Sequence, residues 1–112
     1  MAELKQTAEA RWVFNTSSRH ASRVIMNRLA KSFEFELLEL YPDRGKGCEA
    51  RISFEVIGKT WADKVLNALN QAQLLGRSWS INGDIEDSLD LSCAEFSESG
   101  LKFMWIQMDR ED

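Results

Sequence analysis

The sequence contains only one histidine and two cysteines, the residues that most often build zinc and nucleophile sites. His20 stands alone on the polar side of a predicted helix, and Cys48 and Cys93 are far from any Cys-x-x-Cys spacing. Both cysteines fall in alternating apolar segments, which is typical of small buried side chains. The sequence therefore predicts no metal site and no Cys-His catalytic pair.

Long apolar runs and glycine-rich phosphate loops are also missing. No segment approaches the roughly 20 apolar residues of a membrane span, and the first residues lack the apolar run of a signal peptide. No GxSxG elbow is present, and Glu34 and Glu36 alternate with apolar residues as solvent-facing strand residues do. We therefore expect a cytoplasmic protein without membrane contact, catalytic residues or cofactor.

The composition is that of an ordinary globular protein. Hydrophobic residues make up 44% and charged residues 29%, with one proline and six glycines, which excludes a collagen-like or disordered chain. In 112 residues, two independent cores would each be too small to be stable. We expect a single domain over residues 1–112, in which residues 1–9 show no clear period and form a frayed lead-in.

Periodicity and cap residues predict the first elements. Aromatic and β-branched side chains indicate a strand over residues 11–15, and the hydroxyl residues at 16–18 can cap a helix that continues to about Lys31. An antiparallel hairpin over residues 33–57 follows, with a turn at 42–47 supplied by proline and glycine.

The two strands of this hairpin differ in regularity. From Cys48 to Val56 apolar and polar residues alternate strictly, which predicts one buried and one solvent-facing side. In the preceding strand the alternation changes phase, which indicates a bulge near Leu37 or Leu38.

A second helix is predicted from Thr60, with Gly76 as its left-handed C-terminal cap. Short strands around the Asn82-Gly83 turn and a final strand over 101–108 complete the order. Strand, helix, hairpin, helix and terminal strands predict an α+β fold of the split βαβ, ferredoxin-like type. This fold is a two-layer antiparallel sheet with two helices on one face and an extra C-terminal β-hairpin.

Charge is unevenly distributed along the chain. Residues 83–112 hold nine acidic and two basic residues, a net charge of −7 within a chain of net charge −4. The densest acidic stretch favours a recognition surface for a basic protein, with a solvated loop as the alternative. The predicted binding residues of this stretch are Asp84, Glu86, Asp87 and Asp90. A calcium loop is a weaker alternative, because the carboxylates do not follow the required alternate spacing with a central glycine.

Basic residues gather on the first predicted helix instead. Residues 10–33 contain five cations and no acid, and an alternative phosphate or nucleic-acid site would use Arg19, Arg23, Arg28 and Lys31. The sequence pI of about 5.0 argues against nucleic acid, because such domains usually have a pI above about 9.

Four tryptophans are many for a chain of this length. Trp61 follows the helical spacing of a core residue, whereas Trp12, Trp79 and Trp105 lie in strands whose second face is open in a two-layer fold. Exposed tryptophans anchor protein partners, so Trp79 and Trp105 are chosen as candidate binding residues, with packing in the core as the alternative.

The tryptophan-containing segments 79–85 and 100–106, with the small size and acidic charge, give the chain a resemblance to bacterial toxin-immunity proteins of the contact-dependent growth inhibition type. The resemblance implies a non-enzymatic inhibitor that masks a toxin such as a nuclease. It implies no catalytic residues.

Overall fold

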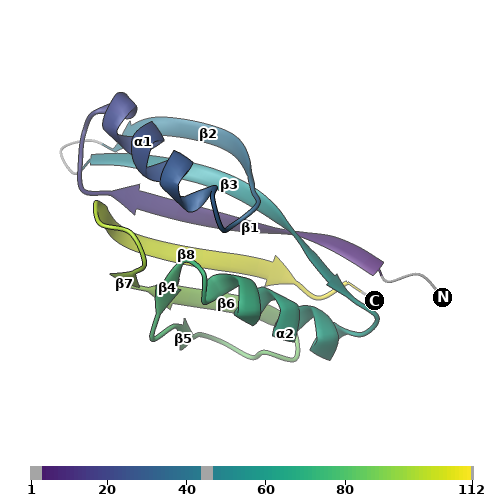
Figure 1. Cartoon of the computed structure of the whole chain (residues 1–112). Coiled ribbons are helices and arrows are strands. Elements are labelled where there is room, and N and C mark those ends of the chain that lie inside the picture. Colours follow the sequence, from purple (N-terminus) through teal and green to yellow (C-terminus); the bar gives the residue numbers. More distant parts are fainter. Residues whose placement is uncertain (1–3, 44–46, 112) are drawn as a thin grey trace.

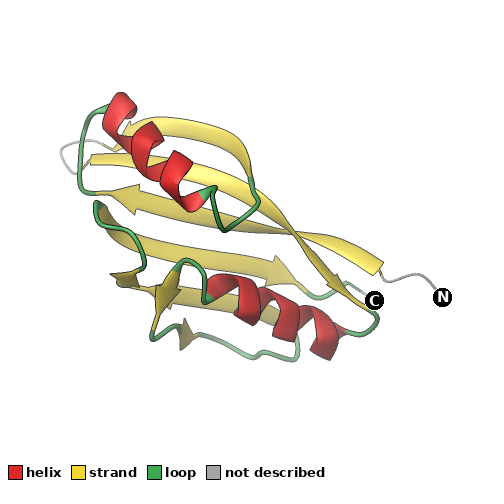
Figure 2. Cartoon of the chain, viewed as in Figure 1, coloured by secondary structure: helices red, strands yellow, loops and turns green. Residues whose placement is uncertain are grey.

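The computed structural model describes residues 4–43 and 47–111, and these form two helices and eight strands (Figures 1 and 2). In chain order the elements are β1 (Leu4–Phe14), α1 (Arg19–Leu29), β2 (Glu36–Asp43), β3 (Gly47–Gly58), α2 (Trp61–Ala72), β4 (Gly76–Arg77), β5 (Ser80–Ile81), β6 (Ser88–Cys93), β7 (Glu95–Phe96) and β8 (Leu101–Asp109).

Six of the strands form one antiparallel sheet in the order β2-β3-β1-β8-β6-β5, and β4 pairs with β7 in a small second sheet. Both helices lie against one face of the large sheet (Figure 2). The α+β class and the antiparallel sheet are therefore confirmed. The ferredoxin-like arrangement is not confirmed, because β6 and β5 extend the sheet beyond β8 although they precede β8 in the chain.

Strand β1 is longer than the sequence predicts. It begins at Leu4, and its pairing with β3 runs from Leu4 opposite Gly58 to Val13 opposite Glu49. The predicted frayed lead-in over residues 1–9 is therefore wrong from Leu4 onward. Ala8 and Ala10 are fully or almost fully buried, but their small side chains give the pattern little hydrophobic contrast.

The hairpin over 33–57 is confirmed as β2 and β3, although residues 44–46 at the centre of the predicted turn lie outside the described residues. The register shifts between Leu37 and Glu39, which confirms the predicted bulge. On β3 the apolar residues from Cys48 to Val56 are all buried on the helix side, as the alternation predicts. They share one core with Trp12 of β1 and with Phe33, whose ring centroid lies 5.2 Å from that of Phe54. Trp12 is fully buried in this core, so the expectation that it lies on an open sheet face is wrong.

Within residues 4–43 and 47–111, no helix covers the opposite face of the sheet. Lys5, Glu9 and Arg11 on β1 are exposed there, as is Glu55 on β3. Ser53 departs from this pattern, because it is buried between its cross-strand neighbours Glu9 and Glu36 despite facing the open side.

Hydroxyl side chains cap both helices. Ser18 Oγ accepts a hydrogen bond from the Ala21 amide at 3.2 Å, and Thr60 Oγ1 accepts one from the Asp63 amide at 3.2 Å. The first helix ends at Leu29, two residues before the predicted end at Lys31.

The predicted left-handed cap at Gly76 is wrong. Helix α2 ends at Ala72, and Gly76 lies in β4. A Cβ atom at Gly76 would lie 2.4 Å from the Glu95 carbonyl oxygen, so glycine is needed there for a close approach of β4 to β7.

Candidate functional site

The loop between β5 and β6 has a fixed conformation that displays carboxylates. Gly83 has a φ of 72°, and Asp84 Oδ1 accepts a hydrogen bond from the Glu86 amide at 3.0 Å. The Asp84 carbonyl also accepts from the amides of Asp87 and Ser88. Asp84, Glu86 and Asp87 are all exposed, so this turn holds three carboxylates at the surface.

Hydrogen bonds attach this loop to α2 and to the end of β8. Trp61 Nε1 donates to the Ile85 carbonyl at 2.8 Å, Arg110 Nη1 donates to the Glu86 carbonyl at 3.0 Å, and the Arg110 amide donates to the Asp87 carbonyl at 3.1 Å. The loop is thereby held beside Asp109 and Glu111, which are also exposed. We call this surface the acidic end and define it by Asp84, Glu86, Asp87, Asp109 and Glu111.

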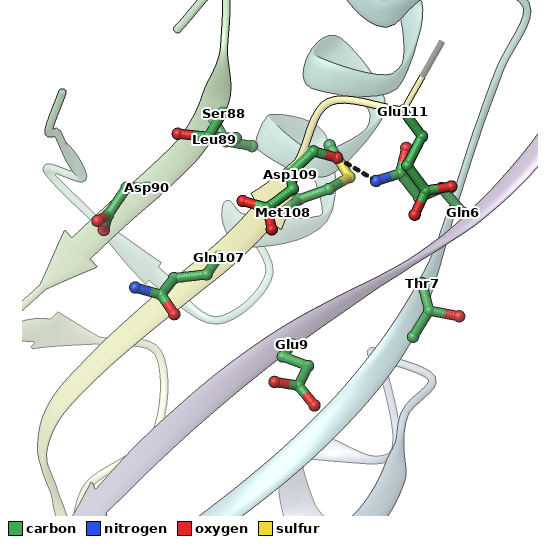
Figure 3. Close-up of a pocket in the computed structure, with 10 residues that line it drawn as sticks. All are labelled: Gln6, Thr7, Glu9, Ser88, Leu89, Asp90, Gln107, Met108, Asp109 and Glu111. Atoms are coloured by element: carbon green, nitrogen blue, oxygen red, sulfur yellow. Dashed lines mark hydrogen bonds between the residues drawn. The ribbon is translucent and has the colours of Figure 1, made fainter. Parts of the chain in front are cut away.

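The acidic end continues into a hollow between β1 and β8 (Figure 3). These strands pair only from Glu9 opposite Gln107 toward the other end of the sheet, and the hollow of about 340 Å³ opens where the pairing stops. Carboxylates line it from three strands and the segment after β8, namely Glu9, Asp90, Asp109 and Glu111. Asp90 thus lies beside the acidic end, on the open face of the sheet.

A buried lysine lies beneath this hollow. Lys64 on α2 is only 6% exposed, and its Nζ donates to Gln6 Oε1 at 3.2 Å. Gln6 Nε2 in turn donates to the Asp109 carbonyl, as Figure 3 shows. These bonds connect α2, β1 and β8 below the acidic residues.

An apolar groove borders the acidic loop on the helix side of the molecule. We call it the α2 groove, and it has a volume of about 490 Å³. It is lined by Trp61, Ala62, Val65, Leu66, Leu69, Ile85 and Glu86. Leu66 is 60% exposed, the largest exposure among the large hydrophobic residues in the described part of the chain. The sequence pattern was not interpreted as a groove. The available signal is Leu66, which lies beside the stripe of Trp61, Val65 and Leu69 and widens the apolar face of the helix.

The two candidate tryptophans lie on different faces. Trp79 is half-buried against the core on the helix side, and its Nε1 donates to the Ala72 carbonyl at 3.0 Å. Trp105 lies on the open face of β8, where its ring centroid is 5.3 Å from that of Phe103 and 5.7 Å from Arg11 Cζ. The structure therefore does not bring Trp79 and Trp105 together, and only Trp105 shares a sheet face with Asp90.

The basic candidates lie elsewhere. Arg19, Arg23, Arg28 and Lys31 are all exposed on α1 or just after it, and α1 lies over β2 and β3 (Figure 1). Two amides of the first turn of this helix already donate hydrogen bonds, Ala21 N to Ser18 Oγ and Ser22 N to the Ser18 carbonyl. The basic helix and the acidic end are thus separate surfaces.

Residue types that bind metals are not grouped in the described residues, where no three His, Cys, Asp or Glu side chains are arranged to hold an ion. Cys48 and Cys93 are free and buried, and His20 is exposed. Neither helix in 4–43 and 47–111 has the length and apolar character to cross a membrane.

Tyr41 is a titratable group whose pKa is perturbed. A hydrogen bond with Glu49 raises the pKa of Tyr41 above its usual value, and burial and the negative charge of Glu49 add to the increase. Tyr41 lies directly opposite Glu49 in the β2–β3 pair, away from the acidic end.

A scan against protein families, a search of curated proteins and a search of solved structures each gave no match for this chain. The resemblance to toxin-immunity proteins therefore stays a prediction.

Proposed function

We propose that this chain is a non-enzymatic protein-binding module whose acidic end binds a basic partner protein. The observation that carries the proposal is the attachment of the acidic loop to the end of β8 through Arg110. Because of it, five carboxylates from two distant parts of the sequence share one exposed surface. Asp90 and Glu9 extend this negative surface into the adjoining hollow.

Fixed carboxylates suit recognition better than a flexible acidic tail. The Asp84 turn and the Trp61 bond hold the loop before a partner arrives, so less conformational entropy is lost on binding. A concentrated negative field also attracts basic partners from a distance and disfavours acidic ones.

The same surface supports an inhibitory role of the immunity type. Proteins that bind nucleic acid do so through basic surfaces. An acidic end that covers such a surface on a nuclease toxin would exclude the nucleic acid. We therefore propose a toxin with a basic active-site surface as the partner.

Amide substitutions that preserve shape test the proposal. The test variant carries Asp84→Asn, Glu86→Gln and Asp87→Asn, and asparagine at position 84 retains the acceptor for the Glu86 amide. The matched control carries Glu34→Gln, Glu36→Gln and Glu39→Gln, which changes the net charge equally at exposed positions before and on β2.

Each variant is used to capture proteins from extracts of the source organism, and association rates are measured with the purified partner. We expect a basic partner that the control retains and the test variant loses. At low salt we expect the test variant to associate about tenfold more slowly, with a smaller difference at high salt. Equal rates for the test and control variants would refute the acidic-end proposal.

The second candidate is a regulator or nucleic-acid-associated factor that uses the first helix. It is supported by the exposure of all four cations, Arg19, Arg23, Arg28 and Lys31, and by the lack of acidic residues in the first turn of α1. Titration with RNA and duplex DNA at two salt concentrations tests it, because phosphate contacts give a steep salt dependence. Absence of binding at low salt would remove this candidate.

A further inference from the structure

The α2 groove extends the binding surface beyond the carboxylates. We infer that it binds an amphipathic helix of the basic partner, whose apolar side chains enter the groove while its lysines or arginines face the loop acids. This inference rests on the proposed function.

The apolar part of the groove fits a helix in length and character. Trp61, Val65 and Leu69 follow one another at four-residue spacing, so the groove extends along about two turns of α2. Leu66 protrudes beside them with most of its surface in water. Burying such a side chain in a partner is favourable in proportion to the apolar area that is removed from water.

The backbone of the groove walls favours a helix over a strand as the occupant. On one side the polar backbone groups of α2 beyond its first turn are used within the helix. On the other side the carbonyls of Ile85, Glu86 and Asp87 already accept hydrogen bonds, and the amides of Glu86, Asp87 and Ser88 already donate them. An added strand would find few partners for its own backbone here. A helix satisfies its backbone internally and binds through side chains.

Charge indicates what surrounds the apolar face of that helix. Of the described residues that line the groove, only Glu86 is charged, and Asp84 and Asp87 lie in the same loop. A partner helix with cations beside its apolar stripe would place them against these carboxylates. An acidic helix would meet like charge, which costs free energy.

Labelled synthetic peptides of about 18 residues, roughly five helical turns, provide a direct test. The probe is an amphipathic leucine–lysine peptide. One comparison peptide has the same composition in a scrambled order without an apolar face, and a second replaces lysine by glutamate. Binding is measured by fluorescence anisotropy with the full chain, with Leu66→Gln and with Leu74→Gln as the matched control. Leu74 is 44% exposed and does not line the groove.

We expect the amphipathic leucine–lysine peptide to bind most tightly, and Leu66→Gln to weaken it at least about tenfold while Leu74→Gln leaves it unchanged. Equal binding of the scrambled peptide, or no effect of Leu66→Gln, would overturn the groove inference. In either of these two outcomes, loss of peptide binding in the Asp84, Glu86 and Asp87 amide variant would still support the acidic-end proposal. Failure of both lysine peptides to bind would count against the groove and the acidic end together.

Self-association is checked by sedimentation velocity of the protein alone. We expect both the unsubstituted protein and the Leu66→Gln variant to be monomers. A dimer that Leu66→Gln dissociates would assign the groove to a second copy of the chain and overturn the inference.

Discussion

Phe54 and Glu55 are adjacent on β3 but face opposite sides of the sheet, so they test the two-layer architecture directly. Phe54 is 3% exposed, and its ring centroid is 5.2 Å from that of Phe33. We expect Phe54→Ala to lower the free energy of unfolding by about 3–5 kcal/mol, as is usual for a large aromatic residue in a filled core. The ring contact with Phe33 accounts for about 0.5–1.5 kcal/mol of that loss.

Glu55→Ala should lower the free energy of unfolding far less than Phe54→Ala. The Glu55 side chain is 65% exposed, and its Oε2 lies 3.8 Å from Lys5 Nζ, a surface ion pair. The hydrogen bond from Gln71 Nε2 goes to the Glu55 main-chain carbonyl, which alanine retains. We therefore expect a change of less than about 0.5 kcal/mol.

Guanidinium unfolding followed by tryptophan fluorescence measures both variants against the unsubstituted chain. The midpoint should move to clearly lower denaturant for Phe54→Ala only, with the slope m unchanged in both. Equal destabilisation by the two substitutions would mean that both sheet faces are covered, and the open face described above would be wrong.

Two further predictions concern titration and the buried lysine. Tyr41 is the only tyrosine, so alkaline absorbance titration reports its pKa directly, and Glu49→Gln should lower that pKa toward the usual value. Because the folded-state pKa of Tyr41 is raised, the stability that Tyr41 contributes is complete below pH about 10 and is lost as the pH rises through the folded-state pKa. An unchanged Tyr41 titration in Glu49→Gln would show that Glu49 does not raise this pKa. Gln6→Leu should destabilise the fold by about 3 kcal/mol, because the buried Lys64 ammonium loses its acceptor. In a double-mutant cycle, Lys64→Met should recover part of this loss, and strict additivity of the two changes would show that the two side chains are not coupled.

The parts of the fold that local pattern determines could be predicted from the sequence. Strict alternation from Cys48 to Val56 places one face of β3 in the core, and the phase change near Leu37 locates the bulge. Strand order was not predictable in this way, because alternation identifies strands without specifying their neighbours. The position of β6 and β5 beyond β8 depends on pairing between distant segments.

Two features of the candidate site depend on tertiary contacts in the same way. The α2 groove exists because Trp61 holds the Ile85 carbonyl from a distant loop, and no local spacing signals that contact. Lys64 is buried although its charge predicts exposure, since Gln6 on β1 supplies an acceptor. The sequence shows the acidic loop as a run of acidic residues, but it does not show that this loop contacts the end of β8.

The most direct test of the account is to map which surface a basic ligand contacts. The leucine–lysine peptide is titrated into ¹⁵N-labelled protein, and backbone amide shifts are followed by NMR. We predict that the largest shifts fall on residues 84–87 and 109–111 and along α2 beside Leu66, while α1 from Arg19 to Leu29 stays unchanged. Shifts concentrated on α1, or on the open face around Phe103 and Trp105, would contradict the assignment of the acidic end as the binding surface.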